Sequence, residues 1–211
     1  MFEETPLSFN PVQFFALSCD CCYLSNEQKL QIKKRLIPST HVLTQEQSFA
    51  KIAFGWHENG LSFLVQVESP IVKSVFPKVE KGDSVELFID TRDLKTAGFN
   101  TRFCHHFFFL PQEVEGNVKG EITHFRTEDR HDLCHSNDLQ LITTLRKEGY
   151  QMEIFIPASC LYGYDPKQFD RIGFTYRINR ASRESQHFSV ISRDYQIDQQ
   201  PSLWASIKLI K

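Results

Sequence analysis

Short segments in which apolar and polar residues alternate run through most of this 211-residue chain. Alternation with a period of two is typical of β-strands, because successive side chains point to opposite faces of a sheet. The alternating segments are residues 50–56, 61–67, 84–90, 103–109, 121–125, 139–145, 150–156, 171–179, 186–192 and 205–210. The sequence therefore predicts an all-β fold, a β-sandwich or jelly roll of about ten antiparallel strands.

Turn signals separate these segments, and one segment has the pattern of a helix. Asn59-Gly60 is typical of a tight hairpin turn, and Lys147-Glu148-Gly149 separates two further strands. Residues 25–36 begin with capping-box spacing and end just before Pro38, so we expect one short helix near the N-terminus. No shift in composition divides the chain, and we expect a single domain over residues 1–211.

Composition excludes several classes of function. Phe occurs 19 times, which favours a β-core, and the formal net charge is −2 with no basic block, so we expect no nucleic-acid partner. No apolar run approaches the ~20 residues of a membrane span. The first residues lack a basic start and include Glu3 and Glu4, so we expect no export signal and a cytoplasmic protein. Its six cysteines are then expected to be reduced thiols.

The segment FCHHFFFLP, Phe103–Pro111, combines candidate metal ligands with a strand pattern. Alternation places His105 on one face of this strand, and Cys104 and His106 on the other. Cys104 and His106 could share a metal only if further ligands came from the segment HDLCH, which contains His131, Cys134 and His135. We favour a polar strand face over this metal site, because two ligands on one strand are too few for structural zinc.

The same rule sorts the strands at 84–90 and 171–179. Val85, Leu87 and Ile89 point to the core and leave Glu86 on the outer face, where Arg177 of the other strand also lies. Motifs of nucleophilic, metalloprotease or nucleotide-binding sites are absent from the sequence. Glu86 and Asp90 could be read as glycosidase carboxylates, but such a pair is more typical of surface charge. We expect no enzyme and no catalytic residues.

Four segments in order, GDSVELFID, GYQMEIFIP, RIGFTYRINRA and WASIKLIK, resemble the family 9 carbohydrate-binding modules and their relatives with a DOMON-like sandwich. The resemblance covers about residues 50–211, with 1–49 forming an N-terminal strand and helix packed on it. It implies a non-catalytic module that binds a carbohydrate or a related small polar ligand. It implies no cofactor, although it leaves room for a calcium ion.

The resemblance also indicates a binding site. Glu86 stands where the family has a sugar-binding glutamate, and Arg177 stands at a polar position of the family. The two tryptophans that clamp the sugar in the family are missing, with Glu80 and Lys81 at one position and Asp198 at the other. The candidate ligand-binding residues are Glu86, His105, His106, Arg177, Asn179 and Tyr195.

Two alternatives stay open. A sandwich without its aromatic clamp still has strand edges and a Phe-rich surface, which would suit a protein-protein interaction module with a protein partner. The other alternative is a metal-dependent enzyme built on Cys104 and the neighbouring histidines.

Overall fold

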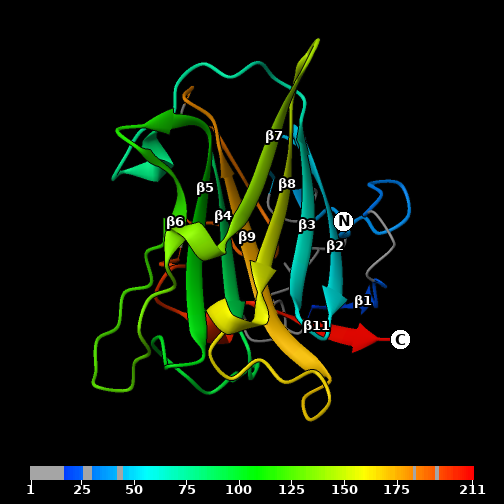
Figure 1. Ribbon diagram of the computed structural model, residues 1–211, viewed down its shortest axis with the longest axis vertical. Helices are drawn as coiled ribbons and strands as arrows, with labels where there is room; N and C mark the ends of the chain where they lie inside the picture. The colour runs from blue at the N-terminus through cyan, green and yellow to red at the C-terminus, as the bar shows by residue number, and fades with distance from the viewer. Residues whose placement is uncertain (1–16, 26–29, 42–44, 183, 193–194) are drawn as a thin grey trace, which may run out of the picture.

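The computed structural model describes residues 17–25, 30–41, 45–182, 184–192 and 195–211. These residues form eleven strands in two sheets, so the predicted all-β sandwich is confirmed (Figure 1). The strands are β1 (Ser18–Cys22), β2 (Ala50–His57), β3 (Gly60–Val67), β4 (Ser84–Asp90), β5 (Cys104–Val114), β6 (Asn117–Glu121), β7 (Gln140–Arg146), β8 (Gly149–Pro157), β9 (Arg171–Asn179), β10 (Ser185–His187) and β11 (Ala205–Ile210). The short 3-10 turns are η1 (Val79–Lys81), η2 (Ser136–Asp138), η3 (Ala158–Cys160) and η4 (Pro201–Leu203).

The two sheets differ in size. The larger has the order β1-β11-β9-β4-β5-β6, with β10 beside β9, and the smaller has the order β2-β3-β8-β7. Strand β1 runs parallel to β11, which corrects the prediction that all strands are antiparallel. The central strands β4, β5 and β9 are paired in continuous antiparallel register, with Glu86 opposite both Phe108 and Arg177.

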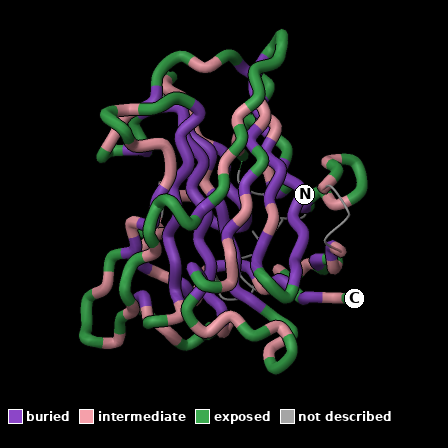
Figure 2. The backbone as a smooth tube through the Cα atoms, viewed as in Figure 1, coloured by how far each residue is buried: buried purple, intermediate pink, exposed green. Residues whose placement is uncertain are grey.

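Aromatic rings fill the space between the sheets. Phe63 of the smaller sheet stacks on Phe54 with ring centroids 4.4 Å apart, and it also lies 5.5 Å from Phe174 of the larger sheet. Figure 2 shows the buried segments, in purple, running along the strands of both sheets. Each fully buried Phe contributes roughly 2–3 kcal/mol through loss of apolar surface from water, so these contacts hold the layers together.

Some strand boundaries differ from the sequence prediction. Strand β6 covers 117–121 rather than 121–125, because the turn at Glu115 and Gly116, both with positive φ, starts the pairing with β5 earlier. The segment 186–192 contributes only the short β10. The predicted helix over 25–36 lies partly outside the described residues. Of the rest, Ile32 to Lys34 form a turn and Leu36 bridges to Ala53 of β2, so the helix prediction is wrong there.

Cys134 and Cys160 form a disulfide, which corrects the expectation that all six cysteines are reduced. The bond links the loop before β7 to η3, the turn that follows β8. The other four cysteines are free thiols. The cytoplasmic location stays a prediction, and a structural disulfide is more typical of an oxidising compartment. No helix among the described residues is long and apolar enough to cross a membrane.

We predict that the disulfide stabilises the fold. Its two cysteines are 26 residues apart in sequence, and a covalent loop of that size restricts the unfolded chain by about 3–4 kcal/mol. Urea unfolding of Cys134→Ala/Cys160→Ala should therefore show a lower free energy of unfolding than wild type. The exposed free thiol Cys22 provides the control, Cys22→Ala, which should unfold like wild type. Equal stability of the double variant and wild type would contradict the prediction.

Candidate ligand-binding site

Four polar side chains meet on the outer face of the larger sheet. Glu86 comes from β4, His106 from β5, and Arg177 and Asn179 from β9. These strands are neighbours in the sheet, and alternation turns all four side chains away from the core. We call these residues the Glu86 cluster. The sequence-based expectation that Glu86 lies beside Arg177 is confirmed in its geometry.

The carboxylate of Glu86 accepts four hydrogen bonds. Its Oε1 accepts from Arg177 Nε at 2.7 Å and from Asn179 Nδ2 at 2.6 Å. Its Oε2 accepts from His106 Nε2 and from Arg177 Nη2, both at 2.8 Å. The guanidinium therefore grips both carboxylate oxygens, which is the strongest geometry that an arginine and a carboxylate can adopt.

Charge compensation explains why this carboxylate can be buried. The Glu86 side chain is 1% exposed, whereas Arg177 is 15% and His106 is 9% exposed. Burial alone would raise the pKa of Glu86, but the hydrogen bonds and charge of His106 and Arg177 outweigh burial and hold the pKa well below its ordinary value. Glu86 is therefore a fixed anion, and a ligand on this face would contact the edges of Arg177 and His106.

Two further acidic groups, besides Glu86, stabilise the charge of Arg177. Burial opposes its charge, but its pKa is raised by Glu86 and, less strongly, by the charges of Asp198 and Glu80. Glu80 lies on η1 and Asp198 on the segment before η4. Glu80 and Asp198 stand at the two positions where the resemblance led us to expect a clamping tryptophan. Their carboxylates therefore act electrostatically on Arg177.

Two apolar groups flank the Glu86 cluster. His106 lies between Cys104 and Phe108 on the outer face of β5, and its ring stacks on Phe88 with centroids 4.2 Å apart. Phe88 and Cys104 belong to a buried group with Val190, Ile197 and Trp204. Phe108 belongs to a second group, with Val79 and Leu110, against which Phe76 packs. The Glu86 cluster therefore lies between two groups of apolar side chains.

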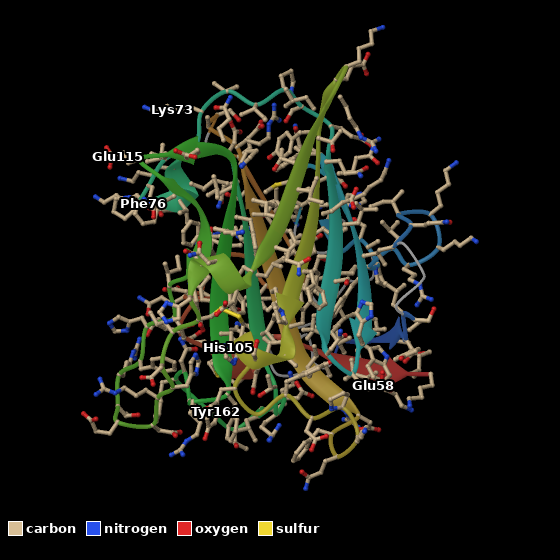
Figure 3. All side chains as sticks on the ribbon, in the orientation of Figure 1. Glu58, Lys73, Phe76, His105, Glu115 and Tyr162 are labelled. Atoms are coloured by element: carbon tan, nitrogen blue, oxygen red, sulfur yellow. A yellow bond between two sulfur atoms is a disulfide. The ribbon has the colours of Figure 1, made fainter. Side chains whose placement is uncertain are left out.

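The remaining predicted site residues lie elsewhere. Tyr195 packs against the Phe88 group on the same outer face. His105 is on the opposite, inner face, where its ring stacks parallel to Phe107 and its Nδ1 contacts Glu121 Oε1 at 2.9 Å. His105 therefore does not lie in the Glu86 cluster, because the alternation of β5 separates it from His106. Figure 3 places His105 near Tyr162, well away from Phe76.

The metal site considered from Cys104 and His106 gains no ligand from His131 or Cys134. His131 contacts His105 on the inner face, and Cys134 is bonded to Cys160, so neither can reach the outer face of β5. Cys104 is also unsuited to nucleophilic chemistry. Burial, helped by the charge of Asp90, raises the pKa of its thiol to about 12, so the thiolate is scarce.

Asp90 has a structural role. Its carboxylate accepts the backbone N–H groups of Arg92 and Leu94, at 2.9 and 2.7 Å, and so closes the turn after β4. It therefore does not pair with Glu86 as a second catalytic carboxylate. Sequence reasoning missed Ser84, whose hydroxyl accepts from Asn179 at 2.9 Å. Ser84 lies two residues before Glu86 in the sequence, and this spacing could have predicted that both side chains point to the same face of the strand.

Comparisons with known proteins agree with this architecture. The family model for carbohydrate family 9 binding domain-like proteins matches residues 19–211. Two solved structures of a family 9 carbohydrate-binding module from Caldicellulosiruptor kristjanssonii are similar, one in complex with cellotriose and one with glucose. Each is 19% identical to the chain; the TM-scores are 0.62 and 0.61, and the matches cover 92% of this chain and 94% and 95% of those chains. None of the curated proteins matches the sequence.

We predict that Glu86 makes stability depend on acid pH. Its pKa in the folded state lies below the ordinary value of 4.5, so below about pH 4.5 the unfolded chain binds more protons and the free energy of unfolding falls as pH falls. Glu86→Gln should flatten this slope between about pH 5 and pH 3. At neutral pH it should also cost about 3–5 kcal/mol, because Arg177 loses its buried partner.

Urea unfolding across this pH range provides the measurement, with Glu113→Gln as the matched control. Glu113 is exposed on β5, so this substitution should leave both the slope and the neutral-pH stability unchanged. The prediction fails if Glu86→Gln and Glu113→Gln have the same pH dependence.

Proposed function

The chain belongs to the carbohydrate family 9 binding domain-like family, and on this basis we propose that the Glu86 cluster is the carbohydrate-binding site of a non-catalytic module. The observation that carries the proposal is the convergence of Glu86, His106, Arg177 and Asn179 on one outer face. Sugar hydroxyls need fixed donors and acceptors, and side chains locked by neighbouring hydrogen bonds supply them at a low entropic cost.

In this proposal the residues have different tasks. Arg177 and His106 retain some exposure and donate to the sugar, whereas the buried Glu86 holds both of them in position. Glu80 and Asp198, whose charges influence Arg177, provide acceptors for hydroxyl groups at the rim. The sugar is thus held mainly by hydrogen bonds, in place of a clamp between two tryptophans.

We infer that one aromatic side chain, Phe76, supports the ligand. Phe76 is half-buried and packs against Phe108, with ring centroids 5.5 Å apart, and Phe108 is paired with Glu86 across β4 and β5. The apolar face of a pyranose packs favourably on such a ring. Trp204 cannot do this, because it is 1% exposed and its indole N–H donates to the Ile197 carbonyl.

The alternative of a protein-interaction module has less support. Ile142 and Leu145 are exposed on β7, an edge strand of the smaller sheet. The two residues are three positions apart in the strand. Their side chains therefore point to opposite faces of the sheet and do not form one apolar surface. A protein partner therefore stays a prediction.

We expect cellotriose or glucose to bind with an affinity that depends on Arg177. Replacing Arg177 by Lys keeps the charge but loses the two-pronged grip on Glu86, and hydrogen bonds to charged groups contribute about 1.5–3 kcal/mol. Arg177→Lys should therefore weaken binding about 10- to 100-fold in isothermal titration calorimetry. His106→Gln should weaken it as well.

Matched controls come from the exposed surface. Arg146→Lys on β7 and His124→Gln, both at exposed positions, should bind like wild type. Circular dichroism of each variant confirms that it is folded. If glucose, cellobiose and cellotriose give neither heat nor a shift in melting temperature with wild type, carbohydrate binding of this kind is wrong. If they bind equally to Arg177→Lys, the site lies elsewhere.

A further inference from the structure

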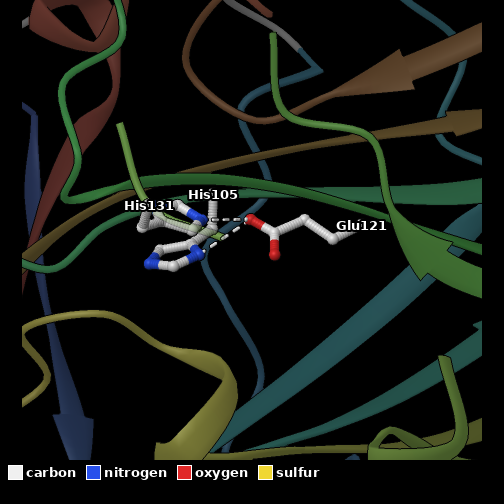
Figure 4. Close-up of side chains that lie close together, drawn as sticks. All are labelled: His105, Glu121 and His131. Carbon is white, nitrogen blue, oxygen red and sulfur yellow. Dashed lines mark hydrogen bonds and ion pairs between the residues drawn. The ribbon is translucent and has the colours of Figure 1, made fainter. Parts of the chain in front are cut away.

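A second polar cluster lies on the inner face of the larger sheet, at one end of the core. Glu121 of β6 is paired with Phe107 of β5, and His105 lies two residues before Phe107 on the same face. His131, from the loop before η2, completes the group (Figure 4). The side chains of His105 and Glu121 are 0% exposed and that of His131 is 4% exposed. We call these three residues the Glu121 cluster.

Both imidazoles contact the same carboxylate oxygen. His105 Nδ1 and His131 Nε2 each lie 2.9 Å from Glu121 Oε1, and the two rings stack with centroids 4.3 Å apart. Burial would raise the pKa of Glu121, but the hydrogen bonds of the two histidines oppose this and hold the pKa below its ordinary value. Its other oxygen accepts the backbone N–H of Cys134 at 2.8 Å.

The hydrogen bonds of His131 require a cation at this point. Its Nδ1 lies 2.7 Å from the carbonyl oxygen of Arg102, which only accepts, so Nδ1 carries the hydrogen. In the neutral ring, Nε2 is then a bare lone pair that faces a carboxylate oxygen. That contact is repulsive unless the ring carries a second proton or both atoms bind a metal ion.

His105 has an unpartnered nitrogen that a metal would explain. If Nδ1 donates to Glu121, Nε2 is a buried acceptor, and no described side chain or backbone group makes a hydrogen bond to it. If Nδ1 instead binds a metal, Nε2 carries the hydrogen. The backbone of Tyr162 lies near the His105 ring. Metal-bound histidines commonly donate the second ring N–H to a carboxylate, a backbone carbonyl or water.

We infer that His105, Glu121 and His131 bind a divalent transition metal ion, for which zinc is the natural probe. Each histidine nitrogen lies 2.9 Å from Glu121 Oε1, and all three ligand atoms lie within 4.8 Å of one another. Small shifts would bring them to the roughly 3.4 Å separation of two ligands on a tetrahedral zinc. Two imidazoles and one carboxylate form a ligand set that suits zinc and similar ions, with one position left for water.

The surroundings fit this inference. A cavity of about 510 Å³, whose lining includes His131, Cys134, Cys160 and Tyr162, opens beside the cluster at His131. Calcium does not suit the ligands, because it takes oxygen donors. Among the described residues the other potential ligand group is Cys134, Asp138 and Cys160, and its sulfurs form the disulfide. The calcium ion for which the resemblance leaves room therefore gains no support at either group.

Zinc uptake by the purified wild-type chain provides the test. The protein is stripped with a chelator, kept in non-reducing buffer to preserve the disulfide, incubated with zinc chloride, desalted and analysed by mass spectrometry for metals. We expect about one zinc ion per chain and a higher melting temperature with zinc. His131→Ala and Glu121→Gln should each lose at least 10-fold in zinc affinity.

His135→Ala is the matched control, because His135 is exposed in the same loop. It should take up zinc like wild type. If the cluster variants do not fold, cobalt-substituted wild type still decides the question, because histidine and carboxylate ligands give a visible spectrum without a thiolate charge-transfer band. No zinc in wild type, or equal affinity in His131→Ala, would overturn the inference and leave an imidazolium–carboxylate pair. Sugar titrations of the zinc-free protein test the proposed function separately.

Discussion

The larger sheet depends on the compensation of one buried carboxylate. Glu86 lies on β4, between β5 and β9. Alternation turns its side chain away from the core, and the flanking apolar groups shield it from water. A buried ion without partners would cost several kcal/mol. Arg177, His106 and Asn179 supply donors from both neighbouring strands, so the same bonds that satisfy the charge also fix the register of β4, β5 and β9.

Strand β5 serves both polar clusters because it carries two adjacent histidines. His106 points outward and donates to Glu86, whereas His105 points inward and meets Glu121. The divergence follows from the pleat alone and needs no special backbone geometry. Neither histidine is replaceable by an apolar residue without leaving a buried carboxylate short of a partner, so the HisHis pair in an otherwise Phe-rich strand reflects two separate electrostatic demands.

The sequence predicted the parts of the fold that local alternation determines. Strands β4, β8 and β9 lie within a residue of their predicted ranges, and Glu86 pairs with Arg177, because side-chain period and apolar content act within a single strand. Features that depend on distant contacts were missed. The Cys134–Cys160 bond and the approach of His131 to Glu121 join segments whose proximity no local pattern encodes. The predicted helix gave way to a turn and a bridge with β2, where tertiary pairing outweighs helix propensity.

Thr123 shows how the two clusters can be close and yet chemically separate. Its hydroxyl accepts the backbone N–H of His106 at 2.8 Å and donates to Glu121 Oε1 at 2.7 Å. The link runs through the His106 backbone, whereas the bond from His106 to Glu86 runs through its ring. The two clusters therefore share no side chain, and the Thr123 link meets the Glu86 cluster at the backbone of β5 and not at the His106 ring.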